Sequence, residues 1–363
     1  MDTAQLAEIS QLEEKVLAAN LPSDLLEKAK GMIVRLDRIA RLGGNYANDF
    51  DATSRYIGWI TSLPWQKRSQ DVLDLKHAEE VLNKNHYGLS GIKDKILEYL
   101  AVLKLTSTTG TNVANGSYGS YESNEKKFNR APILALIGLV GTGKTTLAYS
   151  IAEAMGRKFE RIPFGGIGDA LFLRGQARAY ADAEPGAIIK ALARAGTKNP
   201  VILLDEIDRV AEEARATIMG VLVELLDPEQ NARYTDHYID YPFDLSEVLF
   251  IATGNNTTHI STAVLDRLEP LLMPSYSDEE KIKIGKDYVL PKIMRESNLP
   301  PNAISIGDSV WPKVVRPLGF DGGIRTLERT INNMVRKAAR EIVSGQAQQI
   351  VINEQNVQQF LPA

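Results

Sequence analysis

The 363-residue sequence contains no cysteine, and this absence excludes a disulfide framework. It also lacks any apolar run approaching about 18 residues, the length that marks a membrane-spanning helix. Residues 1–10 have neither the basic nor the apolar region of a signal peptide. We therefore expect a cytoplasmic protein without a membrane partner.

The sequence is also short of positive charge, since its formal net charge at pH 7 is -4. General nucleic-acid binding uses a basic surface, so a nucleic acid is not the partner that we expect. Hydrophobic residues make up 44% of the chain and charged residues 24%, as in ordinary soluble proteins. The length suffices for about two or three domains with a sizeable core.

A phosphate-binding motif lies between residues 131 and 146. An apolar run at 133–137 leads directly into residues 138–145, which fit the pattern G-x-x-x-x-G-K-[ST], and a helix-forming segment follows. Glycines let such a loop curl so that several N–H groups and a helix N-terminus point at one anion. The glycines here are Gly138, Gly141 and Gly143. We expect Lys144 to reach the β- and γ-phosphates of a nucleotide and the Thr145 hydroxyl to ligate Mg²⁺.

Two further apolar runs end in polar residues. Residues 201–204 are followed by Asp205 and Glu206, as when a buried parallel strand delivers carboxylates to the carboxyl edge of a sheet. Asp205 would help to hold Mg²⁺, and Glu206 would orient and polarise the attacking water. The run at 248–254 ends at Asn255, which could position that water or sense the γ-phosphate, or could be a simple turn residue.

The first hundred residues are predicted to be mainly helical. Apolar residues recur at helical spacing from residue 4 to about 43, with a break and a new start at 22–24. This pattern favours two packed helices, although a stalk or an oligomer contact would show it too. Trp59 and Trp65 are expected to build a core rather than bind a ligand. Residues 106–130 are dominated by Ser, Thr, Gly and Asn and are predicted to form a solvated, mobile loop.

Six segments along the chain are similar to segments of one known family. They read WQKRSQDVLDLKHAEEVLNKNHYGLSGIKDKILEYLAV, AGTKNPVILLDEIDRV, LLDPEQN, SEVLFIATGNN, VLDRLE and GGIRTLER. In their order and spacing the chain resembles the ATPase part of the Lon family of AAA+ proteases over roughly residues 5 to 363. The resemblance implies an α/β fold, namely the AAA+ P-loop NTPase fold with a parallel sheet.

The resemblance also implies roles for individual residues. The adenine pocket falls on His86, Tyr87 and Gly88. The phosphate loop, or Walker A motif, covers 138–146 and comprises Gly138, Gly141, Thr142, Gly143, Lys144, Thr145 and Thr146. The Walker B acids are Asp205 and Glu206, sensor 1 is Asn255, the arginine finger is Arg267 and sensor 2 is Arg325. The arginine finger is implied to reach the nucleotide of the neighbouring subunit and to stabilise charge there, so that hydrolysis requires a ring.

The chain also departs from the family. The proteolytic domain with its Ser-Lys dyad does not follow in this sequence, so we expect no peptidase activity from it, and the large N-terminal substrate-binding domain does not precede it. Leu139 and Val140 replace two prolines of the phosphate loop, which should not prevent binding. The pore loop of the family carries an aromatic residue followed by an aliphatic one, and here these positions are Tyr180 and Ala181. Tyr180 should still contact a translocating chain, but more weakly than in the family. The alternative is that Tyr180 is simply an exposed aromatic residue of a loop.

These observations predict three parts: an N-terminal helical neck at 1–84, an α/β nucleotide-binding domain at 85–275 and a small α-helical lid at 276–363. The resemblance implies a homohexamer that binds ATP between subunits and requires Mg²⁺. The predicted function is ATP hydrolysis that drives unfolding or translocation of protein substrates, with a separate protease as an optional partner. Either an excised segment of a full protease or a free-standing ATPase would have this sequence.

The alternative function is that of a non-proteolytic AAA+ ATPase that remodels a specific partner or a nucleic acid. A basic and aromatic pore would favour that alternative, and the acidic balance of the chain does not. A scaffold that binds ATP but hardly hydrolyses it is disfavoured by the presence of Glu206 and Arg267.

Overall fold

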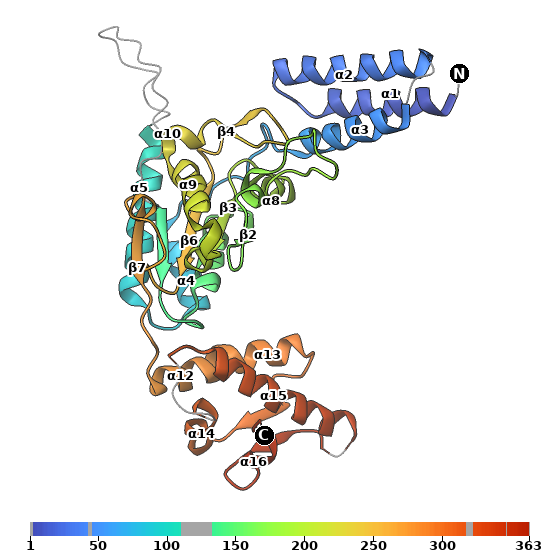
Figure 1. Cartoon of the computed structure of the whole chain (residues 1–363). Coiled ribbons are helices and arrows are strands. Elements are labelled where there is room, and N and C mark those ends of the chain that lie inside the picture. Colours follow the sequence, from blue (N-terminus) through green and yellow to red (C-terminus); the bar gives the residue numbers. More distant parts are fainter. Residues whose placement is uncertain (1–2, 43–45, 110–132, 317–321, 346, 363) are drawn as a thin grey trace.

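A computed structural model describes residues 3–42, 46–109, 133–316, 322–345 and 347–362. In Figure 1 the N-terminal helices, in blue, lie at one end of the molecule, the sheet lies in the middle, and the C-terminal helices, in orange and red, lie at the other end. No helix in these described ranges combines the length and the apolar character needed to cross a bilayer.

The N-terminal part is formed by α1 (Thr3–Ala18), α2 (Ser23–Leu42) and α3 (Tyr46–Ser62). The buried residues of α2 recur every three or four positions, which places them on one face of the helix: Leu25, Ala29, Ile33 and Leu36. Since α1 and α2 pack against each other, the predicted pair of packed helices is confirmed, and α3 packs on both.

Trp65 anchors the end of this helical part against the rest of the chain. Its indole N–H donates to the Ile60 carbonyl at 2.7 Å, and its ring lies 5.0 Å from the Phe243 ring, centroid to centroid. Trp59 packs against the same hydrophobic core. The prediction that both tryptophans build a core is confirmed.

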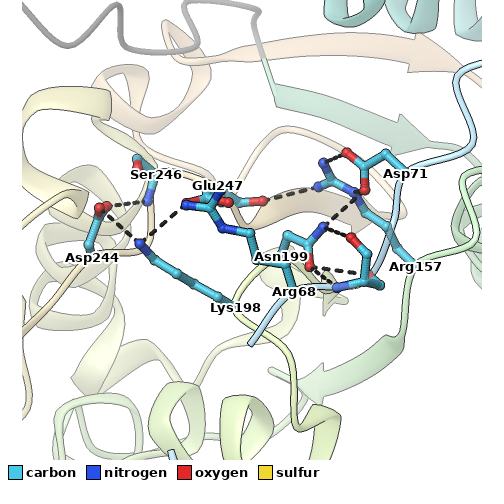
Figure 2. Close-up of polar contacts among 9 residues, drawn as sticks. Arg68, Asp71, Arg157, Lys198, Asn199, Asp244, Ser246 and Glu247 are labelled. Carbon is cyan, nitrogen blue, oxygen red and sulfur yellow. Dashed lines mark hydrogen bonds and ion pairs between the residues drawn. The ribbon is translucent and has the colours of Figure 1, made fainter. Parts of the chain in front are cut away.

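A polar network fastens the segment between α3 and α4 to the sheet. Figure 2 shows Arg157 donating to both carboxylate oxygens of Asp71, at 2.9 and 2.5 Å. The other members of the network are Arg68, Ser69, Lys198, Asn199, Asp244, Ser246 and Glu247. Because β3 begins at Val201 and β6 at Leu249, this network lies at the amino ends of strands, on the side of the sheet away from the phosphate loop.

Within the described residues, the central sheet has five parallel strands in the order β2-β3-β6-β1-β7. They are β1 (Ile133–Ile137), β2 (Phe159–Pro163), β3 (Val201–Asp205), β6 (Leu249–Gly254) and β7 (Leu268–Leu272). Every residue of β3 and β6 is buried, as expected for parallel strands that are covered on both faces. The carboxyl ends of all the strands therefore meet at one edge, and the predicted α/β fold with a parallel sheet is confirmed.

Helices cover both faces of this sheet. One face packs against α4 (Leu75–Asn85), α5 (Ser90–Thr109) and α6 (Lys144–Ala154). The other face packs against α8 (Ala187–Ala195) and α9 (Arg215–Leu226), in a core that continues into the N-terminal helices. Shorter elements complete this region: α7 (Leu171–Arg174), α10 (Pro228–Asn231), α11 (Thr262–Leu265), β4 (Tyr234–Thr235) and β5 (Pro242–Phe243).

After β7 the chain builds another core around Trp311. Its helices are α12 (Asp278–Ile284), a π-helical segment (Gly285–Val289), α13 (Leu290–Glu296), α14 (Trp311–Val315), α15 (Arg325–Val343) and α16 (Val357–Phe360). Two short parallel strands, β8 (Ile304–Ile306) and β9 (Ile350–Ile352), join them. We refer to this C-terminal group as the lid; the predicted domain boundaries themselves stay predictions.

The beginning of the predicted loop at 106–130 differs from expectation. Helix α5 continues through Thr109. Once a helix is nucleated, each further residue adds a backbone hydrogen bond, so the helix can extend into residues of modest helix propensity. The remaining part of that prediction, 110–130, lies outside the described residues.

Candidate active site

The phosphate loop connects the carboxyl end of β1 to α6. Gly141 and Gly143 have φ angles of +81° and +91°, which residues with a Cβ rarely adopt. Gly138 meets a different need, because a Cβ there would lie 2.7 Å from the carbonyl oxygen of Met273. Helix α6 begins at Lys144, so the N–H groups of its first turn have no partner within the helix. The loop therefore has the backbone geometry of an anion-binding site.

Lys144 points into this loop and is only 8% exposed. Its Nζ donates to the carbonyl oxygens of Gly138 and Leu139, at 2.7 and 2.9 Å, and to Asn255 Oδ1 at 3.3 Å. Burial lowers the pKa of the amine, and nearby carboxylates oppose that shift. A buried ammonium group whose hydrogen-bond partners are all uncharged is well suited to a polyanionic ligand.

The other residues of the loop have distinct positions. Thr142 is buried, its hydroxyl donates to the Leu139 carbonyl at 2.9 Å, and its own carbonyl accepts from the Tyr276 hydroxyl at 3.2 Å. Thr145 and Thr146 are exposed on the first turn of α6. Thr145 is therefore accessible to a ligand beside the loop.

Asp205 ends β3 among positively charged and hydroxyl partners. Its Oδ1 accepts from the Thr253 hydroxyl at 2.5 Å, and its Oδ2 accepts from Arg161 Nε at 2.6 Å. Thr253 also accepts the N–H of Glu206 at 2.9 Å, so one hydroxyl on β6 orders both acids of β3. Arg161 comes from the edge strand β2 and compensates the charge of the buried carboxylate.

Glu206 has a left-handed backbone, with φ of +59° and ψ of +48°, which is uncommon for a residue other than glycine. Its carboxylate lies 3.4 Å from Arg209, and a Cβ at position 165 would come within 3.2 Å of its Oε2. Gly165 therefore leaves room for this side chain. Backbone strain of this kind concentrates at functional sites, where the surrounding structure maintains it.

Asp208 and Asn255 couple the ends of β3 and β6. The Asn255 N–H donates to Asp208 Oδ2 at 3.0 Å, and the Asn255 side chain contacts Lys144. Asp208 Oδ1 and Asn255 Nδ2 are buried and make no hydrogen bond within the described ranges. Since buried polar atoms are nearly always hydrogen-bonded, these two atoms mark a place that a ligand or a water molecule completes.

The lid reaches the phosphate loop through the start of α15. The Ile324 N–H donates to the Gly141 carbonyl at 2.9 Å, and a Cβ on Gly323 would lie 2.3 Å from the Val140 carbonyl oxygen. Arg325 is the exposed first residue of α15, and a Cβ on Gly141 would lie 3.1 Å from its Cβ. The structure thus brings Arg325 next to the predicted Walker A motif.

His86, Tyr87 and Gly88 form the turn between α4 and α5, which packs on α6. His86 Nε2 lies 2.9 Å from the Ser150 hydroxyl oxygen. Burial, together with a neighbouring positive charge, lowers the pKa of His86 to about 4, so the ring is neutral at pH 7. Gly88 has a φ of +63°, and Lys283 of the lid lies 5.2 Å from the centre of the Tyr87 ring. The turn is therefore close to both α6 and the lid.

Arg267 lies where the strands begin, at the end of the sheet opposite the phosphate loop. Its carbonyl accepts the N–H of Ile133, the first residue of β1, whereas the phosphate loop follows Ile137, the last residue of that strand. A strand of this length spans roughly 15 Å, more than an arginine side chain can bridge. The guanidinium contacts Asp227 instead. Arg267 is thus not brought together with the other predicted site residues of its own chain.

Tyr180 and Ala181 lie on the loop between α7 and α8, and Tyr180 is 70% exposed. The base of this loop is closed, because a Cβ on Gly175 would lie 2.7 Å from the Gly186 nitrogen. The buried carboxylate of Asp236 accepts the Gly186 N–H at 2.7 Å. The two ends of the loop are thus packed against each other, and the loop exposes Tyr180 to solvent. Beside Tyr180 lies a small pocket of about 110 Å³, which residues of α2 and α3 help to line.

The residues of the phosphate site fit a magnesium nucleotide. Mg²⁺ in proteins is usually held by one or two carboxylates together with phosphate oxygens and water, and the Thr145 hydroxyl and the Asp205 carboxylate are oxygen groups that would suit it. Lys144 and the open first turn of α6 fit the phosphates. The unpartnered Asn255 and Asp208 atoms lie on the same edge of the sheet.

Four residues that the sequence did not single out also take part in this site: Arg161, Thr253, Asp208 and Tyr276. A signal existed for Thr253 and Asp208, because each is a polar residue within or just after an apolar strand. Arg161 had no such signal, since its contact with Asp205 depends on β2 lying beside β3.

Comparisons with known families agree with this geometry. Residues 134–275 match the family described as ATPase family associated with various cellular activities (AAA). Residues 295–351 match the Lon protease AAA+ ATPase lid domain. The two matches cover the sheet with its phosphate loop and most of the lid, and they confirm the predicted AAA+ fold.

Similar curated proteins carry the name Lon protease. That of Desulforamulus reducens is 40% identical over 343 residues, which cover 94% of this chain and 39% of the relative. That of Lawsonia intracellularis is 40% identical over 356 residues, 98% of this chain and 40% of the relative. Lon protease 1 of Bacillus subtilis is 39% identical over 354 residues, 98% of this chain and 43% of the relative. The chain spans about two-fifths of the length of these relatives, and the two family matches and these similarities together match it to the AAA+ ATPase portion of the Lon family.

Proposed function

We propose that this chain binds magnesium ATP at the phosphate loop and hydrolyses it as one subunit of a homo-oligomeric ring, a hexamer, and that hydrolysis drives unfolding or translocation of protein substrates. The position of Lys144 carries the proposal. Its amine is buried in a loop with free helix N–H groups and contacts Asn255, which lies one strand away from Asp205 and Glu206. Cation, amide and two carboxylates thus share one edge of the sheet.

In the proposed reaction, the Lys144 amine exchanges its carbonyl partners for the β- and γ-phosphates. Mg²⁺, held by Thr145 and Asp205, would neutralise charge on the phosphate oxygens. Glu206, the residue directly after β3, orients the attacking water. Asn255 donates through its free Nδ2 to the water or to the γ-phosphate.

The position of Arg267 supports the proposed ring. Phosphoryl transfer needs cationic groups at the γ-phosphate, and Arg267 lies a full strand length from the loop of its own chain. We propose that it acts on the nucleotide of the neighbouring subunit, while Arg325 acts on the nucleotide of its own chain from the start of α15. His86, Tyr87 and Gly88 would border the adenine between α6 and the lid.

Polypeptide is the proposed substrate of the ring. Tyr180 is a large aromatic side chain that is mostly exposed on a loop with a rigid base, which suits contact with a passing chain rather than a role in the core. In an ATPase assay, stimulation of the hydrolysis rate by unfolded casein would support this proposal. Stimulation by a nucleic acid but not by casein would favour the alternative, a remodelling ATPase.

Three proteins test the hydrolysis itself: the wild type, Glu206→Gln and Lys144→Ala. Wild-type protein should release phosphate from magnesium ATP, Glu206→Gln should bind the nucleotide without hydrolysing it, and Lys144→Ala should lose binding. Glu296→Gln, at an exposed position of α13, is the matched control and should hydrolyse ATP normally. Hydrolysis at the wild-type rate by Glu206→Gln would show that the role of this acid is wrong.

A further inference from the structure

Asp227 holds the Arg267 guanidinium from a fixed position. Its Oδ2 accepts from Arg267 Nη2 at 2.9 Å. Its Oδ1 accepts the N–H groups of Glu229 and Gln230, at 3.0 and 3.3 Å, and so caps the start of α10. Because one oxygen is bound to the backbone and the other to the guanidinium, the carboxylate cannot rotate without losing both sets of contacts.

The guanidinium is also held on a second side. Arg267 Nη1 donates to the Ala263 carbonyl at 2.8 Å. The side chains of Arg267 and Asp227 are 28% and 21% exposed, so water screens this pair less than it screens a surface pair. Asp227, which follows α9, and Ala263, which lies in α11, therefore orient the planar guanidinium from two different elements.

This arrangement leaves hydrogen-bonding capacity on the arginine. A guanidinium has five N–H donors, and the contacts with Asp227 and Ala263 use one from each Nη. Nε is buried and makes no hydrogen bond among the residues that the structure describes. Arg267 can thus donate from both Nη atoms to a further anion while Asp227 and Ala263 keep it in place.

The ion pair persists at neutral pH. Burial works against ionisation of Asp227, but the hydrogen bonds from Arg267 and from the two backbone N–H groups outweigh it, so the pKa of this carboxyl lies below its ordinary value. The Asp227 carboxyl is therefore ionised under the neutral conditions of an ATPase assay.

We infer that Asp227 is a positioning residue, which holds Arg267 in the orientation that meets the phosphates bound to the neighbouring subunit. The inference rests on the proposed function, in which Arg267 acts on the neighbour's nucleotide. Because Asp227 orients the Arg267 side chain before the neighbour's phosphates arrive, the entropy cost of ordering this long side chain is not added to the activation free energy of hydrolysis.

Asp227→Asn separates this role from the capping of α10. Asparagine is as good an N-cap as aspartate, so the start of α10 stays intact, whereas the charge that holds Arg267 is lost. We expect nucleotide affinity and the unfolding temperature to remain near the wild type, while kcat for ATP hydrolysis falls about tenfold. Asp37→Asn is the matched control, because it removes the charge from another aspartate-arginine pair, with Arg41 in α2, and it should leave kcat unchanged.

Mixed rings distinguish positioning of Arg267 from a general structural role. Asp227→Asn subunits keep Glu206, and Glu206→Gln subunits keep a correctly held Arg267, so hydrolysis should recover when the two variants are mixed. Mixing Asp227→Asn with Arg267→Ala should restore nothing, because both lack a working arginine. Native mass spectrometry of the mixtures is the control that tests whether mixed rings form.

Each other outcome overturns the inference. Hydrolysis by Asp227→Asn at the wild-type rate would mean that Asp227 does not position Arg267. Faster hydrolysis would mean that Asp227 holds Arg267 back from the phosphates. Slow hydrolysis that Glu206→Gln subunits do not rescue would place the defect in the variant's own site. Wild-type hydrolysis by Arg267→Ala would reject the shared site itself, and with it the inference, whereas an inactive Arg267→Ala beside a fully active Asp227→Asn rejects only the role of Asp227.

Discussion

Replacing Gly323 with alanine should push the lid away from the phosphate loop. The added Cβ would lie 2.3 Å from the Val140 carbonyl oxygen and 2.7 Å from the Gly141 carbonyl carbon. Both distances are about 1 Å shorter than an ordinary van der Waals contact. Because the opposing atoms belong to the backbone, the junction must move as a whole, and the hydrogen bond from the Ile324 N–H to Gly141 is lost.

The expected effect is on nucleotide binding rather than on folding. Loss of one backbone hydrogen bond costs about 0.5–1.5 kcal/mol, and displacement of Arg325 adds to it, so we expect about tenfold weaker binding, equivalent to about 1.4 kcal/mol. The atoms that the new Cβ meets belong to Val140 and Gly141 of the phosphate loop and not to the lid core around Trp311, so the unfolding temperature should change little. Titration with a fluorescent ADP analogue and thermal unfolding measure the two quantities.

The neighbouring glycine supplies the control. A Cβ on Gly322 would lie 2.6 Å from Leu139 Cδ1, the end of an exposed side chain that can rotate away. Gly322→Ala should therefore bind nucleotide nearly as well as the wild type. If Gly323→Ala binds with wild-type affinity, or if both variants are equally weakened, the steric reasoning is refuted.

Three other changes have defined outcomes. Arg161→Gln should lower the Mg²⁺ concentration that half-saturates ADP binding by about fivefold, because Arg161 competes with the cation for Asp205; an unchanged requirement would contradict this. His86 should contribute a loss of stability in the wild type as the pH falls from about 6.5 to about 4, and this contribution is at most about 1.4 kcal/mol per pH unit. The fold lowers the His86 pKa to about 4 and keeps the ring neutral, whereas the unfolded chain takes up the proton. His86→Asn should lose less between pH 7 and pH 5 in thermal unfolding, and equal losses in the two proteins would argue against this cause. Tyr180→Ala should reduce the stimulation of ATP hydrolysis by casein more than the unstimulated rate; an unaffected stimulation would remove Tyr180 from the proposed contact with substrate.

Local elements of the site were readable from the sequence because their causes lie within a few residues. The positive φ angles of Gly141 and Gly143, the burial of Lys144 at the start of α6 and the acids after β3 all follow from a motif that is contiguous in the chain. The same is true of the packed helices α1 and α2, whose apolar spacing is local. The roles of Arg267 and Arg325 were different, since only resemblance to the Lon family suggested them.

The sequence by itself therefore determined the nucleotide-binding motif, the strand ends that carry its polar residues and the parallel α/β class. The tertiary structure alone decided which distant groups meet: Arg161 with Asp205, Asp227 with Arg267, and the Gly323 backbone with Val140. Helical and strand periodicities act over a few residues, whereas these pairs are separated by tens of residues or more and meet only because strands align in a particular order and helices pack between them. The parallel pairing of β1 with β7 also separates the phosphate loop, which follows the carboxyl end of β1, from Arg267, which precedes the amino end of β7.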